Sequence, residues 1–380
     1  MSEPVLGILT LYMNDAKQLE EKPVYRRMIT EGRRLGLDVF VFTPMDVHTG
    51  KQMIHALMYD PRSGKWTRKW RRFPDMIYDR CRIQRSPRFQ QLLRFRSKYS
   101  HLLFLNRPLR NKWTVHQTFS QKGRFRQHLP ETLLYRSSQD LHKMLKLSPI
   151  VYIKPASGTG GRGILRVERL GGVRGIYDVQ GRRQSRQIIP PRKVSLTSLE
   201  SIVRQWCIGG NFIVQQGIPL RLPSGRVHDY RMLVQKNGQG NWEMTGIAGR
   251  VGAARSVTSN LHGGGHAIRA EKLLREWLGS EEKAHKTIET ADKLGIDAAR
   301  YLESSYGALC ELALDLAIDS SGKIYILEVN PKPAREVFAQ SGDSDTYHKA
   351  LVRPLEYALW VYKNKGAAAA VPQTQKAGEE

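Results

Sequence analysis

The first part of the chain alternates short apolar runs with a helical pattern. Apolar residues predict a buried strand at 5–11 and another at 39–42, and the region between them, at 23–35, has the spacing of an amphipathic helix. This order predicts a β-α-β unit of a parallel sheet. A hairpin-like region at 55–73 and a further strand at 75–80 follow. These elements together predict an open α/β sheet.

Two charged residues end the last of these strands. Ligands of open α/β sheets bind beyond the carboxyl ends of the strands. Asp79 and Arg80 are therefore candidate substrate contacts, and ordinary surface positions are the alternative. Helical patterns at 86–103 and 112–121 come next, before Pro130 turns the chain into its middle part.

A glycine-rich segment follows the strand expected at 150–154. The sequence IKPASGTGGRGI there contains the G-x-G-x-x-G spacing of dinucleotide sites, at Gly158, Gly160 and Gly163. That site requires a helix at the third glycine, whereas two alternating apolar runs split by a Gly-Gly pair follow here and predict a β-hairpin. A Walker A loop does not match either, because its lysine follows the last glycine and Lys154 precedes all three. The pattern predicts a strand that ends in a lysine, a glycine flap and a returning strand.

The remainder of the chain predicts two lobes. The first, at about 133–218, holds the glycine flap, an exposed basic loop at 181–193, a helix near 197–207 and a strand at 212–218. The second extends to about residue 362 and contains a long amphipathic helical region at 267–305. Its strands are expected at 229–235, 242–252, 309–319 and 324–330.

The last two of these strands carry a polar pattern. The short turn between them places Asp315 beside Glu328, with Asn330 two residues further on the same face. We expect Ile326 on that face as well, and Leu327 on the other. Oxygen atoms of Asp, Glu and Asn suit Mg²⁺, which commonly bridges carboxylates to nucleotide phosphates. The pattern predicts a magnesium site, and solvated polar positions on a half-exposed strand are the alternative.

The chain is strongly basic, with 61 lysines and arginines against 35 acidic residues and a net charge of +26. Residues 62–126 hold 19 of these basic residues and only Asp75 and Asp79 as acids. Such a basic block attracts polyanions, and the aromatic residues in KWTRKWRRF favour stacking. A solvated basic face without a dedicated ligand is the alternative. Nucleic acid is not the favoured partner, because the sequence contains no known nucleic-acid module.

Other features of the composition are those of a cytoplasmic globular protein. No run approaches the about 18 uncharged apolar residues of a membrane span, and the first residues carry acids without a basic leader. Cys81, Cys207 and Cys310 are far apart and odd in number, which predicts buried free thiols rather than disulfides or a cysteine metal site. The tail at 363–380 lacks apolar periodicity and is expected to be disordered.

The order of these motifs resembles that of the ATP-grasp superfamily of carboxylate–amine ligases. Lys112, Lys154 with the glycine flap, and the segments FIVQQGI, DYRMLV, SNLHGGG and ILEVNP follow one another over about 110–335. SNLHGGG and LEVN make the resemblance specific. The segments VLGILT, PDMIYDR, NKWTVHQ and LPETLLY further resemble the YheC/YheD-like family, known from spore-forming bacteria and associated with the spore coat.

This resemblance implies a fold of the α/β class with α+β lobes, namely an ATP-grasp fold behind an N-terminal Rossmann-like domain. It also implies ATP and two magnesium ions as cofactors. The parts implied are an N-terminal α/β domain with the basic block at 1–110, a small lobe with the glycine flap at 111–218, a large lobe with the magnesium site at 219–362, and the tail at 363–380.

Individual residues also take roles by resemblance. Arg231, near the transferred phosphate, and Asn260, beside the acyl-phosphate site, would be catalytic, while the role of Asp229 stays open. Arg80, His262, Gly263 and Gly264 are candidate substrate contacts, and Asp315, Glu328 and Asn330 would hold the metal ions. The nucleotide would bind at Lys112, Lys154, Ser157, Gly158, Gly160, Gly161, Gly163, Gln215, Gln216, Gly217 and Ile218.

Two positions depart from the family pattern. Gln216 stands in the hinge where relatives often have an acid, which leaves the contacts to adenine or ribose open. Gly263 follows His262 where relatives often have arginine. The second departure would change the substrate or weaken catalysis.

The implied reaction is ATP-dependent ligation, in which a carboxylate takes the γ-phosphate to become an acyl phosphate and an amine then displaces phosphate to form an amide. Magnesium, two lysines and Arg231 would offset the charge of the transition state, and the glycine flap would exclude water. The basic block suggests an acidic peptide or polymer as the acid substrate. The alternatives are a non-catalytic, ATP-binding structural protein of the spore coat and a nucleic-acid binder that uses the basic block.

Overall fold

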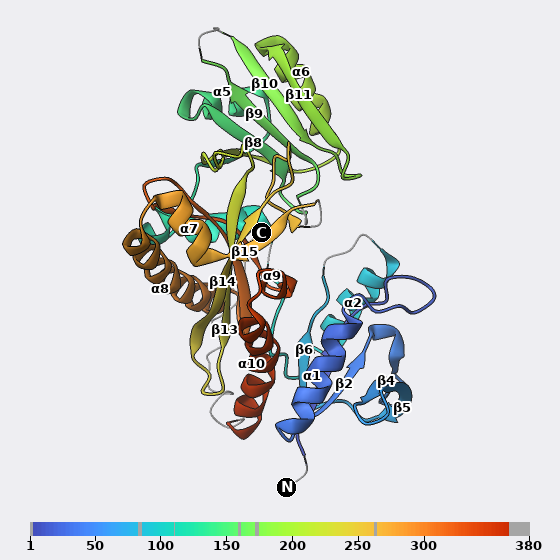
Figure 1. Ribbon diagram of the computed structural model, residues 1–380. Helices are drawn as coiled ribbons and strands as arrows, with labels where there is room; N and C mark the ends of the chain where they lie inside the picture. The colour runs from blue at the N-terminus through green and yellow to red at the C-terminus, as the bar shows by residue number, and fades with distance from the viewer. Residues whose placement is uncertain are drawn as a thin grey trace.

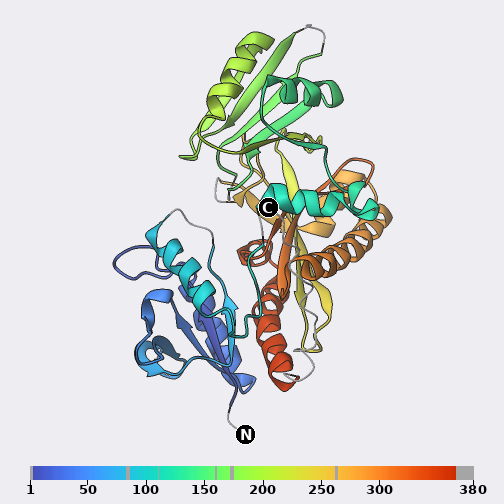
Figure 2. The ribbon, with the colours of Figure 1, turned by 180° about the vertical axis from the view of Figure 1, so that it is seen from behind.

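The described residues form three β-sheets in sequence order, each covered by helices (Figure 1). This mixed helix and sheet architecture is the fold class that the sequence predicts. The view from behind shows the N-terminal sheet and the middle sheet joined to different parts of the C-terminal unit (Figure 2). The computed structural model describes residues 3–82, 86–109, 111–158, 161–171, 175–261 and 264–364.

The N-terminal sheet has the strand order β3-β4-β2-β1-β6, and β5 pairs with β4. Its centre is parallel, as the predicted β-α-β unit requires, because both β2 and β6 pair with β1 in the parallel sense. Its helix α1 begins with a proline in the first turn, where a missing N–H costs nothing, and the turn after it contains Gly36 at φ +74°. The elements are β1 (Val5–Leu9), α1 (Lys22–Arg34), β2 (Asp38–Phe42), η1 (Pro44–Asp46), β3 (Val47–His48), β4 (Met53–Asp60), β5 (Lys65–Arg71), β6 (Met76–Asp79) and α2 (Pro87–Lys98).

The middle sheet has the order β11-β10-β9-β8-β12-β7, and α5 and α6 pack on one apolar core with it. The predicted exposed basic loop at 181–193 is confirmed only at 183–187, because β10 extends to Arg182 and β11, which pairs with it, begins at Ile188. Two prolines within β11 argued against a strand in the sequence. They are tolerated because β11 is at the edge of the sheet and pairs on one side only. Two helices precede this sheet in the chain, α3 (Lys112–Ser120) and α4 (Gly123–Arg126), and they pack on the core of the C-terminal sheet. The elements of the middle sheet and its helices are β7 (Thr132–Leu134), α5 (Ser138–Leu147), β8 (Ile150–Pro155), β9 (Ile164–Arg169), β10 (Ile176–Arg182), β11 (Ile188–Ser195), α6 (Leu196–Trp206) and β12 (Phe212–Gln216).

The C-terminal sheet has the order β15-β14-β13-β16-β17, and α8 packs on one of its faces. The predicted start of the helical region at 267 is wrong, because residues 266–269 form β15, which pairs with β14. This pairing with a distant strand overrides the local helical pattern. The elements are β13 (His228–Lys236), β14 (Trp242–Val251), β15 (His266–Arg269), α7 (Ala270–Leu278), α8 (Glu281–Tyr306), β16 (Glu311–Ile318), β17 (Ile324–Asn330), α9 (Glu336–Gln340) and α10 (Ser344–Lys363).

A β-bulge in β17 changes which residues share a face. Asp315 lies opposite Glu328, as predicted, but Leu316 lies opposite Ile326, so that Leu327 is the extra residue. Ile326 therefore packs into the apolar core beneath the sheet, and not on the face of Glu328 as expected. Asp315 and its two partners in the neighbouring strands, Arg231 and Glu328, lie on the opposite, polar face of the sheet.

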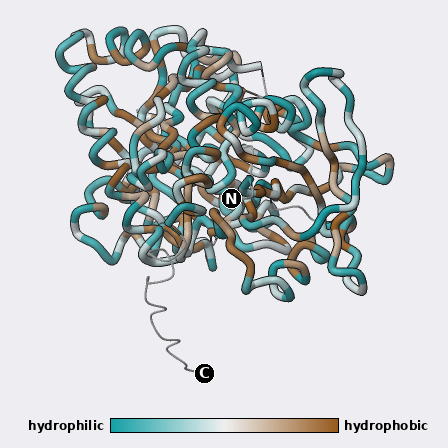
Figure 3. Tube along the Cα trace, turned by 90° about the horizontal axis from the view of Figure 1, so that it is seen from below, coloured by the Kyte–Doolittle hydropathy of each residue, from teal (hydrophilic) through white to brown (hydrophobic). Residues whose placement is uncertain are grey.

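Helix α10 connects the first and last parts of the chain. Leu351 and Leu355 of α10 belong to the same buried cluster as Leu6 of β1 and Tyr25 of α1. In the view from below, apolar stretches run through the interior of the units and hydrophilic stretches lie outside (Figure 3). The N-terminal sheet is thereby packed against the unit that carries the candidate metal ligands.

Several other predictions can be compared with the described residues. Cys81 and Cys310 are buried free thiols, while Cys207 is free but only partly buried. Within the described residues, no helix is both long and apolar enough to cross a membrane. The predicted disorder of the tail falls on residues outside the description from 365 onward, and the predicted boundaries after residues 110, 218 and 362 stay predictions.

Candidate functional site

The polar face of the C-terminal sheet gathers charged residues from four strands. Arg231 of β13 lies opposite Asp315 of β16, which in turn lies opposite Glu328 of β17. On the other side of β13, Asp229 lies opposite Arg250 of β14. Because residues opposite each other in antiparallel strands point to the same face, this register alone brings the five side chains together.

The arginines hold the carboxylates in a continuous network. Arg231 Nε donates to Asp315 Oδ1 at 2.5 Å, and Arg250 Nη2 lies 3.1 Å from Asp315 Oδ2. Arg250 also donates to both oxygens of Asp229, at 2.7 and 2.6 Å. Burial would raise the pKa of Asp315, but the two guanidinium groups hold it below the ordinary value. Asp315 is therefore a buried anion whose partners are already in place.

Arg250 is the residue of this network that the sequence reasoning missed. Its guanidinium is buried, and although burial opposes the charge, Asp229 and Asp315 keep its pKa above the ordinary value. Asp229, whose role the sequence left open, is the carboxylate that holds the Arg250 guanidinium in place. A usable signal was a single arginine in the otherwise apolar and small sequence TGIAGRVG of β14.

Lys112 reaches this face from α3, a helix whose Val115 and Phe119 pack into the core of the C-terminal sheet. Asn111 caps α3, because its Oδ1 accepts from the backbone N–H of Thr114 at 3.0 Å. The backbone N–H of Lys112 donates to the carbonyl of Ala156 at 3.1 Å, which joins the helix start to the end of β8. The Lys112 ammonium then lies 3.0 Å from Glu328 Oε2. The lysine and the acid, predicted separately, are in direct contact.

Lys154 approaches from the end of β8. Its ammonium donates to Gln215 Oε1 of β12 at 2.6 Å. Burial and the neighbouring charge of Lys112 lower its pKa from 10.5 to about 8, while Glu328 and Asp315 act in the opposite direction. Lys154 of the middle sheet, Lys112 of α3 and the two acids of the C-terminal sheet therefore share one electrostatic site.

His116 lies one turn after Lys112 on α3 and was not predicted. Its ring stacks on that of Trp113, with 5.8 Å between the centroids. Burial and the charge of Lys154 lower its pKa from 6.5 to about 4. His116 is therefore an uncharged neighbour of the lysine at neutral pH.

The glycine flap meets the loop that contains Asn260. Gly161 has φ +65°, and a Cβ at this position would lie 2.0 Å from Asn260 Nδ2. Gly163 has φ +67°, and its carbonyl accepts from Trp206 Nε1 at 3.1 Å. Both glycines are thus required by backbone conformation, and the first also by the close approach of the two parts.

The hinge segment of the expected nucleotide site packs against β8. Gly217 N donates to the carbonyl of Ile150 at 2.7 Å, and a Cβ on Gly217 would lie 2.3 Å from the Ile150 side chain. Gln216 Oε1 accepts from the backbone N–H of Glu131 at 3.1 Å, and Ile218 is buried. Ser157 and Gly158 are exposed.

Four of the expected residues lie in or beside parts of the chain outside the description. Gly160, His262 and Gly263 are not among the described residues. Gly264 is described and has φ +88°. Their roles at the nucleotide and substrate sites stay predictions.

Arg80 occupies a different environment from the one expected. Its side chain is fully buried, and its guanidinium binds Glu21 at 2.9 Å and Glu311 at 2.7 Å. Asp79 is also buried and lies 2.6 Å from Arg96 and 3.3 Å from Lys332. Neither side chain is open to a substrate in this structure, because the C-terminal unit covers the end of β6.

The site fits a polyphosphate and a hard metal ion. The site contains four cations, from Lys112, Lys154 and the two arginines, and three carboxylates, from Asp229, Asp315 and Glu328, so that its net charge is positive. No cluster of three or more His, Cys, Asp or Glu side chains that could hold a metal occurs among the described residues. Asp315, Glu328 and the amide of Asn330 could supply part of a coordination shell, and phosphate oxygens would complete it, as is usual for Mg²⁺.

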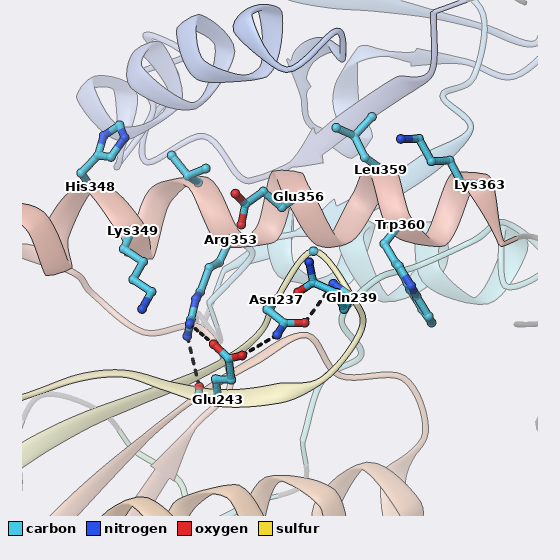
Figure 4. Close-up of a pocket in the computed structure, with 12 residues that line it drawn as sticks. Asn237, Gln239, Glu243, His348, Lys349, Arg353, Glu356, Leu359, Trp360 and Lys363 are labelled. Atoms are coloured by element: carbon cyan, nitrogen blue, oxygen red, sulfur yellow. Dashed lines mark hydrogen bonds and ion pairs between the residues drawn. The ribbon is translucent and has the colours of Figure 1, made fainter.

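A cavity of about 680 Å³ lies away from this site, between α10 and the β13–β14 turn (Figure 4). Two of its charged groups pair with each other, since Arg353 binds Glu243, which also accepts from Asn237 at 2.5 Å. None of the residues predicted for nucleotide, metal or substrate lines it. The cavity is therefore a separate feature of the C-terminal unit.

Comparison with known proteins identifies similar sequences and folds. Residues 101–361 match the family described as YheC/D like ATP-grasp. The chain is 26% identical over 339 residues to the endospore coat-associated protein YheC of Bacillus subtilis (strain 168), covering 87% of this chain and 90% of that protein.

Two solved structures have a similar fold. D-cycloserine synthetase DcsG matches with a TM-score of 0.54 at 13% identity, covering 93% of this chain and 99% of that one. D-alanyl-alanine synthetase A from Vibrio cholerae O1 biovar eltor str. N16961 matches with a TM-score of 0.53 at 12% identity, covering 96% and 98%. At these identities the likeness shows the fold alone.

Proposed function

The chain belongs to the YheC/D-like ATP-grasp family, and we propose that it is an ADP-forming carboxylate–amine ligase that uses ATP and magnesium. Its fold is of the ATP-dependent ligase type. One observation carries the proposal: Lys154 of the middle sheet and Lys112 of α3 converge on Asp315 and Glu328 of the C-terminal sheet. Folding alone does not require a lysine of one sheet and a lysine of a helix to share one site with two acids of another sheet.

The charges of the site suit transfer of a phosphoryl group to a carboxylate. That transfer brings several anions together, and Lys112, Lys154 and Arg231 would offset their charge. Magnesium, held by Asp315, Glu328 and Asn330, would supply further positive charge at the phosphates. Arg250 would keep Asp229 and Asp315 oriented through its hydrogen bonds to both.

The flap and the loop at Asn260 would protect the product of the first step. An acyl phosphate hydrolyses when water reaches it, so that the site must close before the amine attacks. Gly161 already meets Asn260 across the two units. We propose that this contact shuts the site over the reacting groups, with Asn260 beside the acyl phosphate.

The acid substrate is proposed to be an acidic peptide or polymer. At least seven basic residues of the block at 62–126 are ion-paired, for example Arg68 with Asp46 and Arg71 with Asp38. Four exposed basic residues of the block, Arg62, Lys65, Lys69 and Arg72, lie on the β4–β5 hairpin or directly after it, and the other described ones lie on α2, around α4 and at Arg107. This hairpin is the surface where a polyanion would dock.

The first experiment measures ATP consumption with magnesium and fractions of a cell extract, following ADP, AMP and phosphate together. We expect ADP and phosphate to depend on one fraction and to vanish in Glu328→Gln, because Glu328 would lose its charge toward the metal. Glu289→Gln on the exposed face of α8 is the matched control. Retained turnover in Glu328→Gln would contradict the site, and AMP would contradict the acyl-phosphate route.

Association with the spore coat, which the relative's name states for YheC, is proposed for this chain together with synthesis in the cytoplasm. The alternative function is that of a structural protein of the spore coat that binds ATP without turnover. ATP binding without turnover in every fraction would favour that alternative.

A further inference from the structure

The strand that carries Glu328 and Asn330 is weakly fixed by its own sheet. β17 is the edge strand and pairs only with β16, and its ladder is interrupted by the bulge at Leu327. The chain then continues as Asn-Pro-Lys-Pro, in which Pro331 and Pro333 have no backbone N–H to donate. The end of this strand therefore needs an anchor from outside the sheet.

The N-terminal part of the chain supplies that anchor. Asn106 Nδ2 donates to the carbonyl of Pro331 at 3.0 Å, and Arg80 Nη2 donates to the carbonyl of Pro333 at 2.9 Å. The Lys332 ammonium lies 3.3 Å from Asp79 Oδ1. Every residue of the Pro-Lys-Pro segment is thus held by a buried side chain from the end of β6 or the segment that follows α2.

The side chain of Arg80 is itself part of a buried ion-pair network. Arg80 is fixed by Glu21 and by Glu311, the first residue of β16. Glu311 also binds Arg335 at 2.6 Å, and Arg335 donates to the hydroxyl of Tyr78 at 2.7 Å. The end of β6 is therefore tied both to the strand of Asp315 and to the segment after Asn330.

We propose that Arg80 and Asn106 are positioning residues for the metal site. They hold the end of β17 so that Glu328 and Asn330 stand at the correct distance from Asp315. The N-terminal unit is then part of the site without touching nucleotide or metal. This inference rests on the proposed function, because it requires that Glu328 and Asn330 hold Mg²⁺.

Magnesium makes such positioning consequential. Mg²⁺ demands near-ideal octahedral geometry with ligands at about 2.0–2.1 Å, so that a small shift of a strand end weakens binding of the ion. Loss of a group that orients a ligand typically lowers metal affinity by about 10–100-fold. Nucleotide affinity in the absence of metal depends on Lys112 and Lys154, which the anchor does not touch.

The test measures metal affinity directly, using the full chain saturated with a non-hydrolysable ATP analogue. Free Mn²⁺ is followed by electron paramagnetic resonance, and metal-free nucleotide affinity by calorimetry. We expect Asn106→Ala to weaken Mn²⁺ binding by about 10-fold and to leave metal-free nucleotide affinity unchanged. Asn237→Ala, which removes a side chain from the distant β13–β14 turn, should leave both affinities unchanged.

A second variant covers the case in which Asn106→Ala does not fold. Lys332→Met removes the contact to Asp79 with little change in volume, and we expect the same selective loss of metal affinity. Unchanged Mn²⁺ affinity in the folded variants, even with a lower unfolding midpoint, would overturn the inference and leave the anchor a structural feature. Failure of the unmodified protein to bind Mn²⁺ with nucleotide would instead overturn the proposed function.

Discussion

Lys154 should make nucleotide binding depend on pH. Burial and the charge of Lys112 lower its pKa to about 8 in the free protein. A bound phosphate favours the charged form and raises the pKa, so that binding above pH 8 takes up a proton. Affinity should therefore be constant at low pH, where Lys154 is already charged, and should fall as the pH rises through about 8.

The size of the effect follows from the pKa of Lys154. With a pKa of about 8, most molecules carry the charge at pH 7 and about one in eleven carries it at pH 9. If the pKa in the complex lies well above 9, the dissociation constant should rise about tenfold between these values, which is about 1.4 kcal/mol. Below about pH 7 no further gain is expected.

Calorimetric titration with a non-hydrolysable ATP analogue, without metal and at constant ionic strength, measures this directly. Lys154→Arg keeps the charge throughout and should remove the pH dependence. His116 offers an independent check, because its pKa of about 4 is lowered by burial and by Lys154. In Lys154→Met, NMR titration of His116 should show its pKa moving up toward 6.5. A wild-type affinity that is equal at pH 7 and pH 9, or a pH dependence that persists in Lys154→Arg, would refute the reasoning.

Two further predictions concern the flap and the hairpin. Gly161→Ala should lower the free energy of unfolding by about 1–2 kcal/mol through its positive φ, measured by urea denaturation, and should weaken nucleotide binding several-fold because the new Cβ meets Asn260. Gly36→Ala, at φ +74° with open space around it, should show the strain but not the loss of binding, and an equal loss in both variants would contradict the flap contact. The rate of ligation of a polyanionic acid substrate should fall at least tenfold between low and moderate salt concentration. The rate should fall less steeply in the double variant Lys65→Gln/Lys69→Gln. The control Lys283→Gln/Lys286→Gln on α8 should show the salt dependence of the wild type. Activity that hardly changes with salt would exclude docking on the hairpin.

Much of the site was predictable because its parts are local. Asp315 and Glu328 are joined by one short turn, and such a turn sets the register of the two strands. Lys154 follows a buried strand, and the glycines after it mark a flap. Arg250 was missed because its partner Asp229 is on a different strand, so that only the pairing of β13 with β14 shows them together.

Arg80 shows the limit of the same reasoning. Its place directly after β6 led to the prediction of a substrate contact, which requires that this end of the strand be open. The C-terminal unit covers that end, and Glu311, 231 residues further along the chain, takes up the guanidinium. The expectation that ligands bind at strand ends considers one sheet alone. It does not take into account that another unit of the same chain can pack on that end of the sheet.

By itself, the sequence determined most of the local elements, the lysine and glycine-rich segment at the end of β8, and the pairing of Asp315 with Glu328. Periodicity and turn geometry act over a few residues, which is why they can be read along the chain. The tertiary structure alone decided that Ile326 turns into the core at a bulge, that Lys112 of α3 and Lys154 of the middle sheet meet the acids of the C-terminal sheet, and that the N-terminal unit anchors the end of β17. The partner of a buried charge or a free carbonyl depends on how distant segments pack, and no local pattern specifies that packing.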